Sequence, residues 1–327
     1  MEEFYMDNKV VTRRTFLKGT GLTLMALSGI RIPVGSAESY SIEQKVPYSS
    51  GSEVPNFEVP LNATDCHHHI YDSRFPVDPN STLRHPNATV ADYRLLQKRL
   101  GTTRNVIVQP STYGVDNSGL VESLKEFGFE NTRGIAVVNA SVTDAELAEL
   151  HKFGVRGIRF NMSVPGEATT MDMVQTLAQR VNELGWHIQV VAKPDKILAG
   201  KDIWSSVPCP VVFDHLGHIT SVDQPAFEVI LNLLREGKGW VKLSGAYILS
   251  KVGSPTYADR TIVAKAYVNE VPGQLVWGSD WPHPTSKIDN KPDDAILMSL
   301  LAEWAPDEAI RNCILVDNPA RLYGFSD

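Results

Sequence analysis

The chain has 327 residues, of which 43% are hydrophobic, and its 31 Lys and Arg against 38 Asp and Glu give a formal net charge of −7. This is the composition of an ordinary globular protein that can bury a large core, which excludes the disordered and fibrous classes. The acidic balance argues against a nucleic-acid partner, because phosphate binding relies on a basic surface.

The N-terminal segment has the pattern of an export signal. Residues 12–19 (TRRTFLKG) resemble the twin-arginine signal, with Arg13 and Arg14 as the pair. The apolar stretch at 21–30 is too short to span a membrane, and the small residues 35–37 offer a cleavage point. An amphipathic surface helix with a chance arginine pair is the weaker alternative. We therefore expect a twin-arginine signal peptide over residues 1–37, a polar leader over 38–60 and a folded domain over 61–327.

From residue 63 onward, short apolar runs rich in β-branched residues alternate with longer stretches of helical periodicity. Eight strands followed by helices over ~250 residues predict an α/β fold, a single-domain (β/α)8 TIM barrel. A doubly wound open sheet is the alternative, but no glycine-rich nucleotide loop supports it. The predicted strands are 63–70, 105–111, 133–140, 155–162, 187–193, 210–217, 241–247 and 275–281. The predicted helices include 91–100, 143–153, 171–184, 225–235, 257–270 and a closing pair over 307–325.

Polar side chains gather at the C-terminal ends of three predicted strands, which is the end where TIM-barrel active sites are built. Strand one ends with His67, His68 and His69, and alternation places His67 and His69 on one face and His68 on the other. Strand six ends with His215 and strand eight with Asp280. Taken singly, each could be a buried structural group or a helix cap. Three imidazoles and a carboxylate from three strands can meet only in the barrel centre, so together they predict an active site.

Five segments of the chain resemble the amidohydrolase superfamily, and specifically its amidohydrolase-2 branch. This branch contains 2-pyrone-4,6-dicarboxylate lactonase, 4-sulfomuconolactone hydrolase and galactarolactone isomerase. The resemblance covers nearly the whole predicted domain and implies a carboxylic-ester hydrolase that opens a carboxylate-bearing lactone, with the lactone or its hydroxy-acid product as partner. The segments are 65–72 (DCHHHIYD), 154–161 (GVRGIRFN), 213–217 (FDHLG), 242–247 (KLSGAY) and 277–283 (WGSDWPH).

The resemblance also implies roles for the strand-end cluster. Asp280 is the general base that takes a proton from the attacking water, and His67, His69 and His215 surround and polarise the lactone carbonyl. A carboxylate among imidazoles supplies the base and the donors that this chemistry needs. Imidazoles beside an anionic carboxylate are also expected to hold their protons more readily. The isomerase branch can lose the first histidine and the strand-eight aspartate, and both are present here, which favours hydrolysis over isomerisation.

Metal use separates this interpretation from its main alternative. Many superfamily members bind zinc through the equivalents of His67, His69, His215 and Asp280, and these four are the expected ligands if a metal is present. Strand five offers Gln189 where a metal enzyme is expected to place a histidine or a carbamylated lysine, so we expect catalysis without a metal or other cofactor. A zinc-dependent amidohydrolase or decarboxylase of the same branch is the alternative. A periplasmic binding protein is a third reading, although a binding site gains little from a desolvated carboxylate beside imidazoles.

Arg159, near the end of strand four, is the candidate for holding a substrate carboxylate, because its planar guanidinium matches that group. Arg156 is instead expected in an inter-strand or surface ion pair. The resemblance places further arginines of pyrone-dicarboxylate lactonase where this chain has Pro165 and Ile248, which favours a lactone with fewer anionic groups. The other candidates for binding substrate are Ser111, Tyr113, Asn117, Gln189, Tyr247 and His283.

The export signal predicts where the protein acts. The twin-arginine machinery carries folded cargo, so we expect the mature protein in a bacterial periplasm or outside the cell, with no stable membrane span after cleavage. A reporter fused to residues 1–40 should reach the periplasm, as measured by fractionation, and Arg13→Lys combined with Arg14→Lys should abolish its export. Retention of the unmodified fusion in the cytoplasm would show that the signal assignment is wrong.

Overall fold

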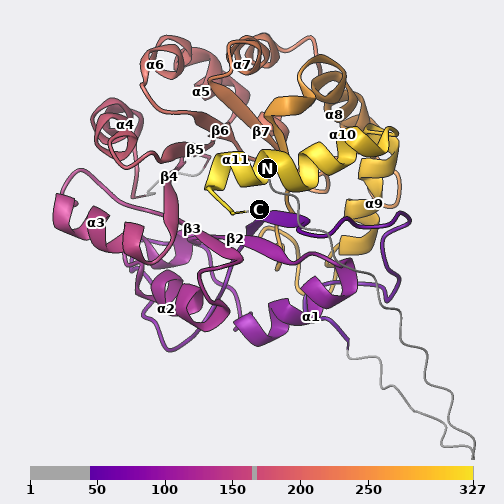
Figure 1. The fold of residues 1–327 in the computed structure, drawn as a ribbon, viewed down its shortest axis with the longest axis horizontal. Coiled ribbons are helices and arrows are strands. Elements are labelled where there is room, and N and C mark those ends of the chain that lie inside the picture. Colours follow the sequence, from indigo (N-terminus) through magenta and orange to yellow (C-terminus); the bar gives the residue numbers. More distant parts are fainter. Residues whose placement is uncertain (1–44, 164–167, 327) are drawn as a thin grey trace, which may run out of the picture. The chain divides into compact units, whose positions relative to one another are not determined.

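Eight parallel strands arranged in chain order build the sheet of this computed structural model, which describes residues 45–163 and 168–326 (Figure 1). Each strand pairs with the next, and a parallel bridge between His68 and Trp281 closes β1 onto the segment after β8. The predicted (β/α)8 barrel is therefore confirmed, although each strand ends earlier than the sequence indicated. The strands are β1 (Thr64–His68), β2 (Arg104–Val108), β3 (Thr132–Ala136), β4 (Val155–Asn161), β5 (His187–Val191), β6 (Val211–Phe213), β7 (Gly239–Leu243) and β8 (Leu275–Trp277).

Helices surround the barrel and begin where the sequence provides caps. Thr89 and Thr143 each form a reciprocal capping box with the acidic residue three positions later. Pro225 begins its helix at the first position, where its missing N–H is not needed. The main helices are α1 (Val90–Leu100), α2 (Ser118–Phe127), α3 (Asp144–Lys152), α4 (Val174–Asn182), α5 (Pro194–Ala199), α6 (Lys201–Ser206), α7 (Pro225–Arg235), α8 (Ala258–Glu270) and α9 (Asp294–Trp304).

The C-terminal segment differs from the expected helix pair. It forms α10 (Glu308–Asn312), a π-helical turn η5 (Cys313–Asp317) and α11 (Asn318–Tyr323) without a break between them. Pro319 cannot donate a hydrogen bond to the preceding turn, and the wider π turn directly before it accommodates this loss. The Asn318 amide holds the segment to the barrel by donating to the carbonyl oxygens of Pro272 (2.9 Å) and Leu275 (2.7 Å).

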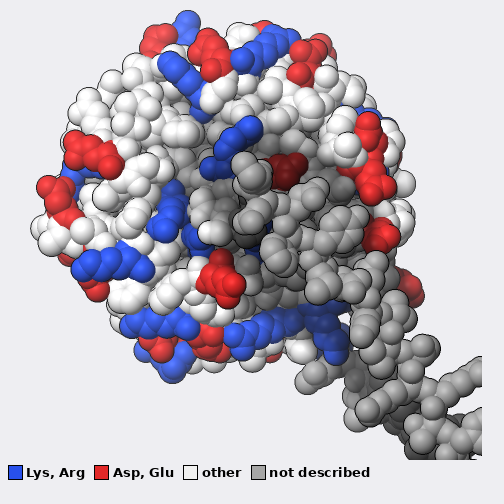
Figure 2. Space-filling view, in the orientation of Figure 1, with Lys and Arg blue, Asp and Glu red and all other residues white. Residues whose placement is uncertain are grey.

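This C-terminal segment closes one end of the barrel. Figure 1 shows α11 lying across the barrel end, where Tyr323 and Phe325 pack against inward side chains such as Val106 and Val276. Arg133, the second residue of β3, donates to the carbonyl oxygens of Tyr323 (3.2 Å) and Gly324 (2.7 Å). Acidic and basic side chains lie interspersed along much of the rim of this face (Figure 2). The floor is thus sealed, and the C-terminal strand ends at the other side remain for a functional site.

The expected signal peptide, residues 1–37, lies outside the described residues. The described part of the expected leader, residues 45–60, contains neither helix nor strand and contacts the barrel. There, the Trp281 indole donates to the Pro47 carbonyl oxygen (2.7 Å), and the Ser50 N–H donates to the Pro292 carbonyl oxygen (3.0 Å). Among the described residues, none of the helices combines the length and the apolar character that crossing a membrane requires.

Candidate active site

The ends of β1, β6 and β8 bring the predicted cluster together at the open end of the barrel. Asp280 Oδ1 lies 3.5 Å from His67 Nε2, 3.4 Å from His69 Nε2 and 4.0 Å from His215 Nε2. His68 faces the opposite side of β1, where its ring stacks on Tyr93 with ring centroids 3.6 Å apart. The alternation read from the sequence therefore describes all three histidines of strand one.

Strained backbone places the side chains after β6 and β8. Asp280 has φ +64° and His215 has φ +54°, both in the left-handed region that non-glycine residues seldom adopt. Each such conformation costs about 1–3 kcal/mol and persists only where the surroundings hold it. At Asp280 the holding contact is its own N–H, which donates to the His67 carbonyl oxygen at 2.7 Å. The turn thus fixes the carboxylate against the first strand.

Burial sets the protonation of the cluster. Asp280 is 2% exposed, and burial alone would raise the pKa of its carboxyl, but His215, His69 and His67 hold that pKa well below its usual range. Burial lowers the pKa of His67 and of His215. The expectation that the imidazoles would hold their protons more readily is therefore wrong for these two, because desolvation outweighs the nearby carboxylates. The site thus pairs an anionic carboxylate with two imidazoles, His67 and His215, whose charged form is disfavoured by burial.

A second layer of buried charges lies against the imidazoles. Asp214 Oδ2 accepts hydrogen bonds from Arg159 Nε (3.1 Å) and Gln189 Nε2 (3.0 Å), and its Oδ1 lies 3.3 Å from His67 Nδ1. Lys242 Nζ donates to Gln189 Oε1 (2.7 Å) and lies 3.6 Å from Asp214 Oδ1. Asp214 and Lys242 were not predicted as site residues from the sequence, although both occur in matching motifs. A charged residue inside an otherwise apolar strand is the signal that could have found them.

A cavity of about 100 Å³ opens above this cluster. Arg159 and Ser111 line it as expected, and Ser111 Oγ accepts a hydrogen bond from Asn161 Nδ2 (2.9 Å). Asn161, His218 and Thr285 are lining residues that the site prediction lacked. Asn161 and His218 occur within or beside the matching motifs. A polar side chain close to a strand end is the sequence signal that could have identified them.

Five candidate substrate-binding residues do not line this cavity, and protein groups hold at least one polar atom of each. Gln189 bridges Lys242 and Asp214. The Tyr113 hydroxyl accepts from the Asp72 N–H (2.7 Å) and donates to the Asp72 carbonyl oxygen (3.0 Å). His283 Nε2 lies 3.0 Å from Asp294 Oδ2, and both side chains are fully buried. The Asn117 amide is held by Val137, as donor to its carbonyl oxygen (2.8 Å) and acceptor from its N–H (3.0 Å).

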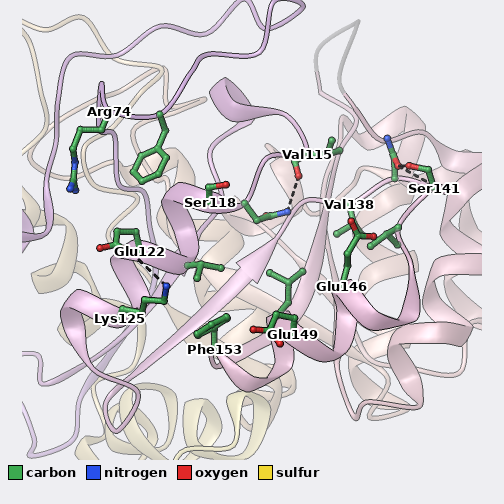
Figure 3. Close-up of a pocket in the computed structure, with 16 residues that line it drawn as sticks. Arg74, Val115, Ser118, Glu122, Lys125, Val138, Ser141, Glu146, Glu149 and Phe153 are labelled. Carbon is green, nitrogen blue, oxygen red and sulfur yellow. Dashed lines mark hydrogen bonds and ion pairs between the residues drawn. The ribbon is translucent and has the colours of Figure 1, made fainter.

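Asn117 instead lines a larger hollow of about 660 Å³ between α2 and α3. Figure 3 shows Glu122 and Lys125 on one side of this hollow and Glu146 and Glu149 on the other, with Phe153 at its base. No histidine is among its described lining residues. Its position on the outer helices, away from the strand ends, separates it from the cluster.

Tyr247 contacts the carboxylate rather than the open cavity. Its hydroxyl donates to Asp280 Oδ2 at 2.6 Å, while Ser244 Oγ lies 3.0 Å from His215 Nδ1. The loop after β7 therefore supports both the carboxylate and the third imidazole. Tyr247 leaves Asp280 Oδ1 as the oxygen that faces the imidazoles.

The cluster also fits a divalent metal ion. His67 Nε2, His69 Nε2 and Asp280 Oδ1 form a triangle, here named the donor triangle, with sides of 3.3, 3.4 and 3.5 Å. Ligand bonds of about 2.0–2.1 Å in a tetrahedral arrangement give ligand separations of roughly 3.4 Å. These three residues, with His215 beside them, could hold a zinc ion, and all three donor atoms are buried. Strand five adds no ligand, since the Gln189 amide is engaged elsewhere.

The fold and the cluster define a class of protein, a (β/α)8 barrel with a carboxylate among imidazoles at its strand ends. A model of the Amidohydrolase family matches residues 64–325, and the chain belongs to this family. It is 35% identical over 283 residues to a 2-pyrone-4,6-dicarbaxylate hydrolase from Comamonas testosteroni (82% of this chain, 92% of that protein). It is 35% identical over 278 residues to a 4-sulfomuconolactone hydrolase from Rhizobium radiobacter (82% and 92%). An apo crystal structure from Agrobacterium tumefaciens matches with a TM-score of 0.79 and 29% identity (85% and 99%).

The hydrogen bond from Tyr247 to Asp280 predicts an effect on the carboxyl. Tyr247→Phe removes a donor that stabilises the charged form, so the pKa of Asp280 should rise. A hydrogen bond to a charged group contributes about 1.5–3 kcal/mol, which corresponds to a rise of at least about one unit. Carboxyl ¹³C NMR across pH would measure it. Tyr113→Phe is the matched control, because its hydroxyl bonds only Asp72 in this region, and an equal shift in both variants would contradict the assignment.

Proposed function

We propose that this protein is a hydrolase that opens a carboxylate-bearing lactone to its hydroxy acid. The observation that carries the proposal is the placement of one Asp280 oxygen within 4.0 Å of three imidazoles at the open end of the barrel. The hydrolases from Comamonas testosteroni and Rhizobium radiobacter, to which the chain is similar, support the reaction class by their names.

In the proposed reaction, Asp280 takes a proton from a water molecule as the water oxygen attacks the lactone carbonyl carbon. His67, His69 and His215 surround and polarise the carbonyl oxygen, and the N–H groups that face it stabilise the developing oxyanion. The ring C–O bond then breaks, and the leaving alkoxide takes the proton from Asp280. The carboxylate is thereby restored, and one water molecule has been added to the lactone.

Arg159 is proposed to hold a carboxylate of the substrate. Its Nε donates to Asp214, which fixes the guanidinium plane and leaves the other two nitrogens for a ligand. Apolar Ile248 lines the same cavity, which supports a lactone with fewer anionic groups than a pyrone dicarboxylate. Export to the periplasm, proposed from residues 1–37, would place this reaction outside the cytoplasm.

A zinc-dependent amidohydrolase or decarboxylase is the second candidate, and the donor triangle favours it. A bound divalent ion would polarise the carbonyl and lower the pKa of a bound water. We favour the metal-independent reaction because Gln189 supplies no ligand from β5.

A lactone panel tests the reaction class directly. Purified protein should release acid from at least one carboxylate-bearing lactone, measured by a pH indicator, and the uncharged parent lactone should be a poorer substrate. Turnover of amides or decarboxylation without lactone opening would favour the second candidate. Ligand binding without any turnover would instead favour a binding protein.

Variants at Asp280 and Arg159 should fail differently. Asp280→Asn keeps the shape but removes the base, so kcat should fall by a factor on the order of 10²–10⁴ while substrate still binds. Arg159→Met removes an anchor from both ground and transition states, so KM should rise, with a loss of roughly 2–4 kcal/mol in kcat/KM. Steady-state kinetics on folded variants would show this, and near-normal turnover by Asp280→Asn would overturn the assigned role.

Chelation separates the two candidate functions. Since β5 offers no ligand, prolonged treatment with a chelator should leave lactone hydrolysis nearly unchanged. The measurement pairs activity with metal analysis of the same sample. Loss of activity together with loss of zinc, and recovery of both on adding zinc, would establish the metal-dependent reaction.

A further inference from the structure

We propose that Lys242 is a positioning residue that holds the proton of His67 on Nε2, so that the donor triangle presents an N–H group instead of three lone pairs. The proposal rests on the metal-independent function above and deepens it. It assigns a task to a buried lysine that touches neither the cavity nor the reacting atoms.

His69 has a fixed tautomer when it is neutral. Its Nδ1 lies 2.8 Å from the Val108 carbonyl oxygen, which can only accept a hydrogen bond. A neutral His69 therefore carries its proton on Nδ1, and its Nε2 has a lone pair. His67 Nε2 lies 3.3 Å from this nitrogen. Two lone pairs at that distance repel each other, so without a cation between them His67 must supply the proton.

The N–H groups of Lys242 determine which nitrogen of His67 carries the proton. Its ammonium group has three N–H bonds, and two of them are directed at the Cys66 carbonyl oxygen (2.8 Å) and Gln189 Oε1 (2.7 Å). The Gln189 amide cannot be reversed, because its Nε2 donates to the Asp214 carboxylate, which only accepts. Two acceptors remain for the third N–H, and we assign it to His67 Nδ1, which lies nearer to Lys242 Nζ (3.3 Å) than Asp214 Oδ1 does (3.6 Å). A ring nitrogen that accepts this bond carries no proton, which places the His67 proton on Nε2.

Asp214 is the competitor for the same ring nitrogen. Its Oδ1 lies 3.3 Å from His67 Nδ1 and could accept a proton held there. His67 Nε2 would then have a lone pair, and the donor triangle would be the three-acceptor arrangement that a metal ion requires. The two possible partners of His67 Nδ1 therefore correspond to the two candidate functions.

Charge balance favours Lys242. The carboxylates of Asp214 and Asp280 are matched by the cations of Lys242 and Arg159, so these four buried groups sum to zero, and the neighbouring Asp65 carboxylate is stabilised by four hydrogen-bond donors of its own. Buried charges are tolerated when they are paired, and a divalent ion added to a balanced set would carry two uncompensated charges. The set therefore needs no further cation. Without one, the repulsion between the lone pairs of His67 Nε2 and His69 Nε2 requires the proton on His67 Nε2.

Histidine ¹⁵N NMR on chelator-treated protein tests the proposal without substrate. Two-bond ¹H–¹⁵N correlations distinguish a protonated from an unprotonated ring nitrogen, and loss of a signal in His67→Gln assigns His67. We expect the wild-type proton on Nε2. A proton on Nδ1 in the wild type would overturn the proposal, and this measurement needs no variant at Lys242 to fold.

Two variants separate the hydrogen bond from the charge. Lys242→Met removes the donor, so the His67 proton should move to Nδ1, against Asp214. Arg159→Met removes one positive charge beside the same carboxylate but has no contact with His67, so the proton should stay on Nε2. Partners of metal ligands typically change metal affinity 10–100-fold, so Lys242→Met should bind zinc at least about tenfold more tightly than Arg159→Met, measured by calorimetry.

Equal zinc affinity in the two variants, or a His67 proton that stays on Nε2 in folded Lys242→Met, would overturn the role of Lys242. These outcomes are distinct from failure of the proposed function. An inactive lactone panel would remove the function while leaving the proton position measured, and an active lactonase with the proton on Nδ1 would remove only the role of Lys242.

Discussion

The geometry of the site depends on one buried carboxylate at the seam where the barrel closes. Asp65 Oδ1 accepts hydrogen bonds from the N–H groups of His67 (3.1 Å) and Ser279 (2.9 Å), and its Oδ2 accepts from the hydroxyls of Ser279 (2.6 Å) and Tyr93 (2.9 Å). Burial raises the pKa of Asp65 to about 6, against the lowering effect of these four donors. Asp65 and Ser279 are 214 residues apart in the sequence. The distance between His67 and Asp280 is thus set by a direct link between the first strand and the last.

Around this seam the charged side chains form two layers, an upper one at the cavity and a lower one that holds it in place. In the upper layer Asp280, His69 and His215 line the cavity, whereas the lower layer of Asp214, Gln189 and Lys242 is enclosed by protein. Arg159 belongs to both, because its Nε bonds Asp214 and its side chain lines the cavity. Enclosed polar groups exchange no partners with water and therefore hold the upper layer in one arrangement.

The sequence predicted the strands, the barrel and the meeting of His67, His69, His215 and Asp280, because these follow from periodicity and from the position of strand ends. It did not predict which polar side chains would face the cavity. Three residues, Tyr113, Asn117 and His283, were candidates by their position along the chain. Their polar atoms instead bond protein partners, because loop geometry, which periodicity does not encode, sets their direction. Gln189 lies on the predicted face of β5, but its amide bonds Asp214 beneath the imidazoles instead of lining the cavity.

The sealed barrel floor determines how substrate and product enter and leave the enzyme. Among the described residues, Tyr323 and Phe325 block the N-terminal end of the strands, which leaves the mouth above Asp280 for a ligand to enter and leave. A lactone and the hydroxy acid made from it must therefore use the same opening in turn. If Arg159 holds a substrate carboxylate as proposed, the acid, which keeps every carboxylate of the lactone and gains another, meets the same guanidinium on its way out. Accumulated product would accordingly act as a competitive inhibitor, and the rate in a closed compartment would depend on how quickly that acid is removed.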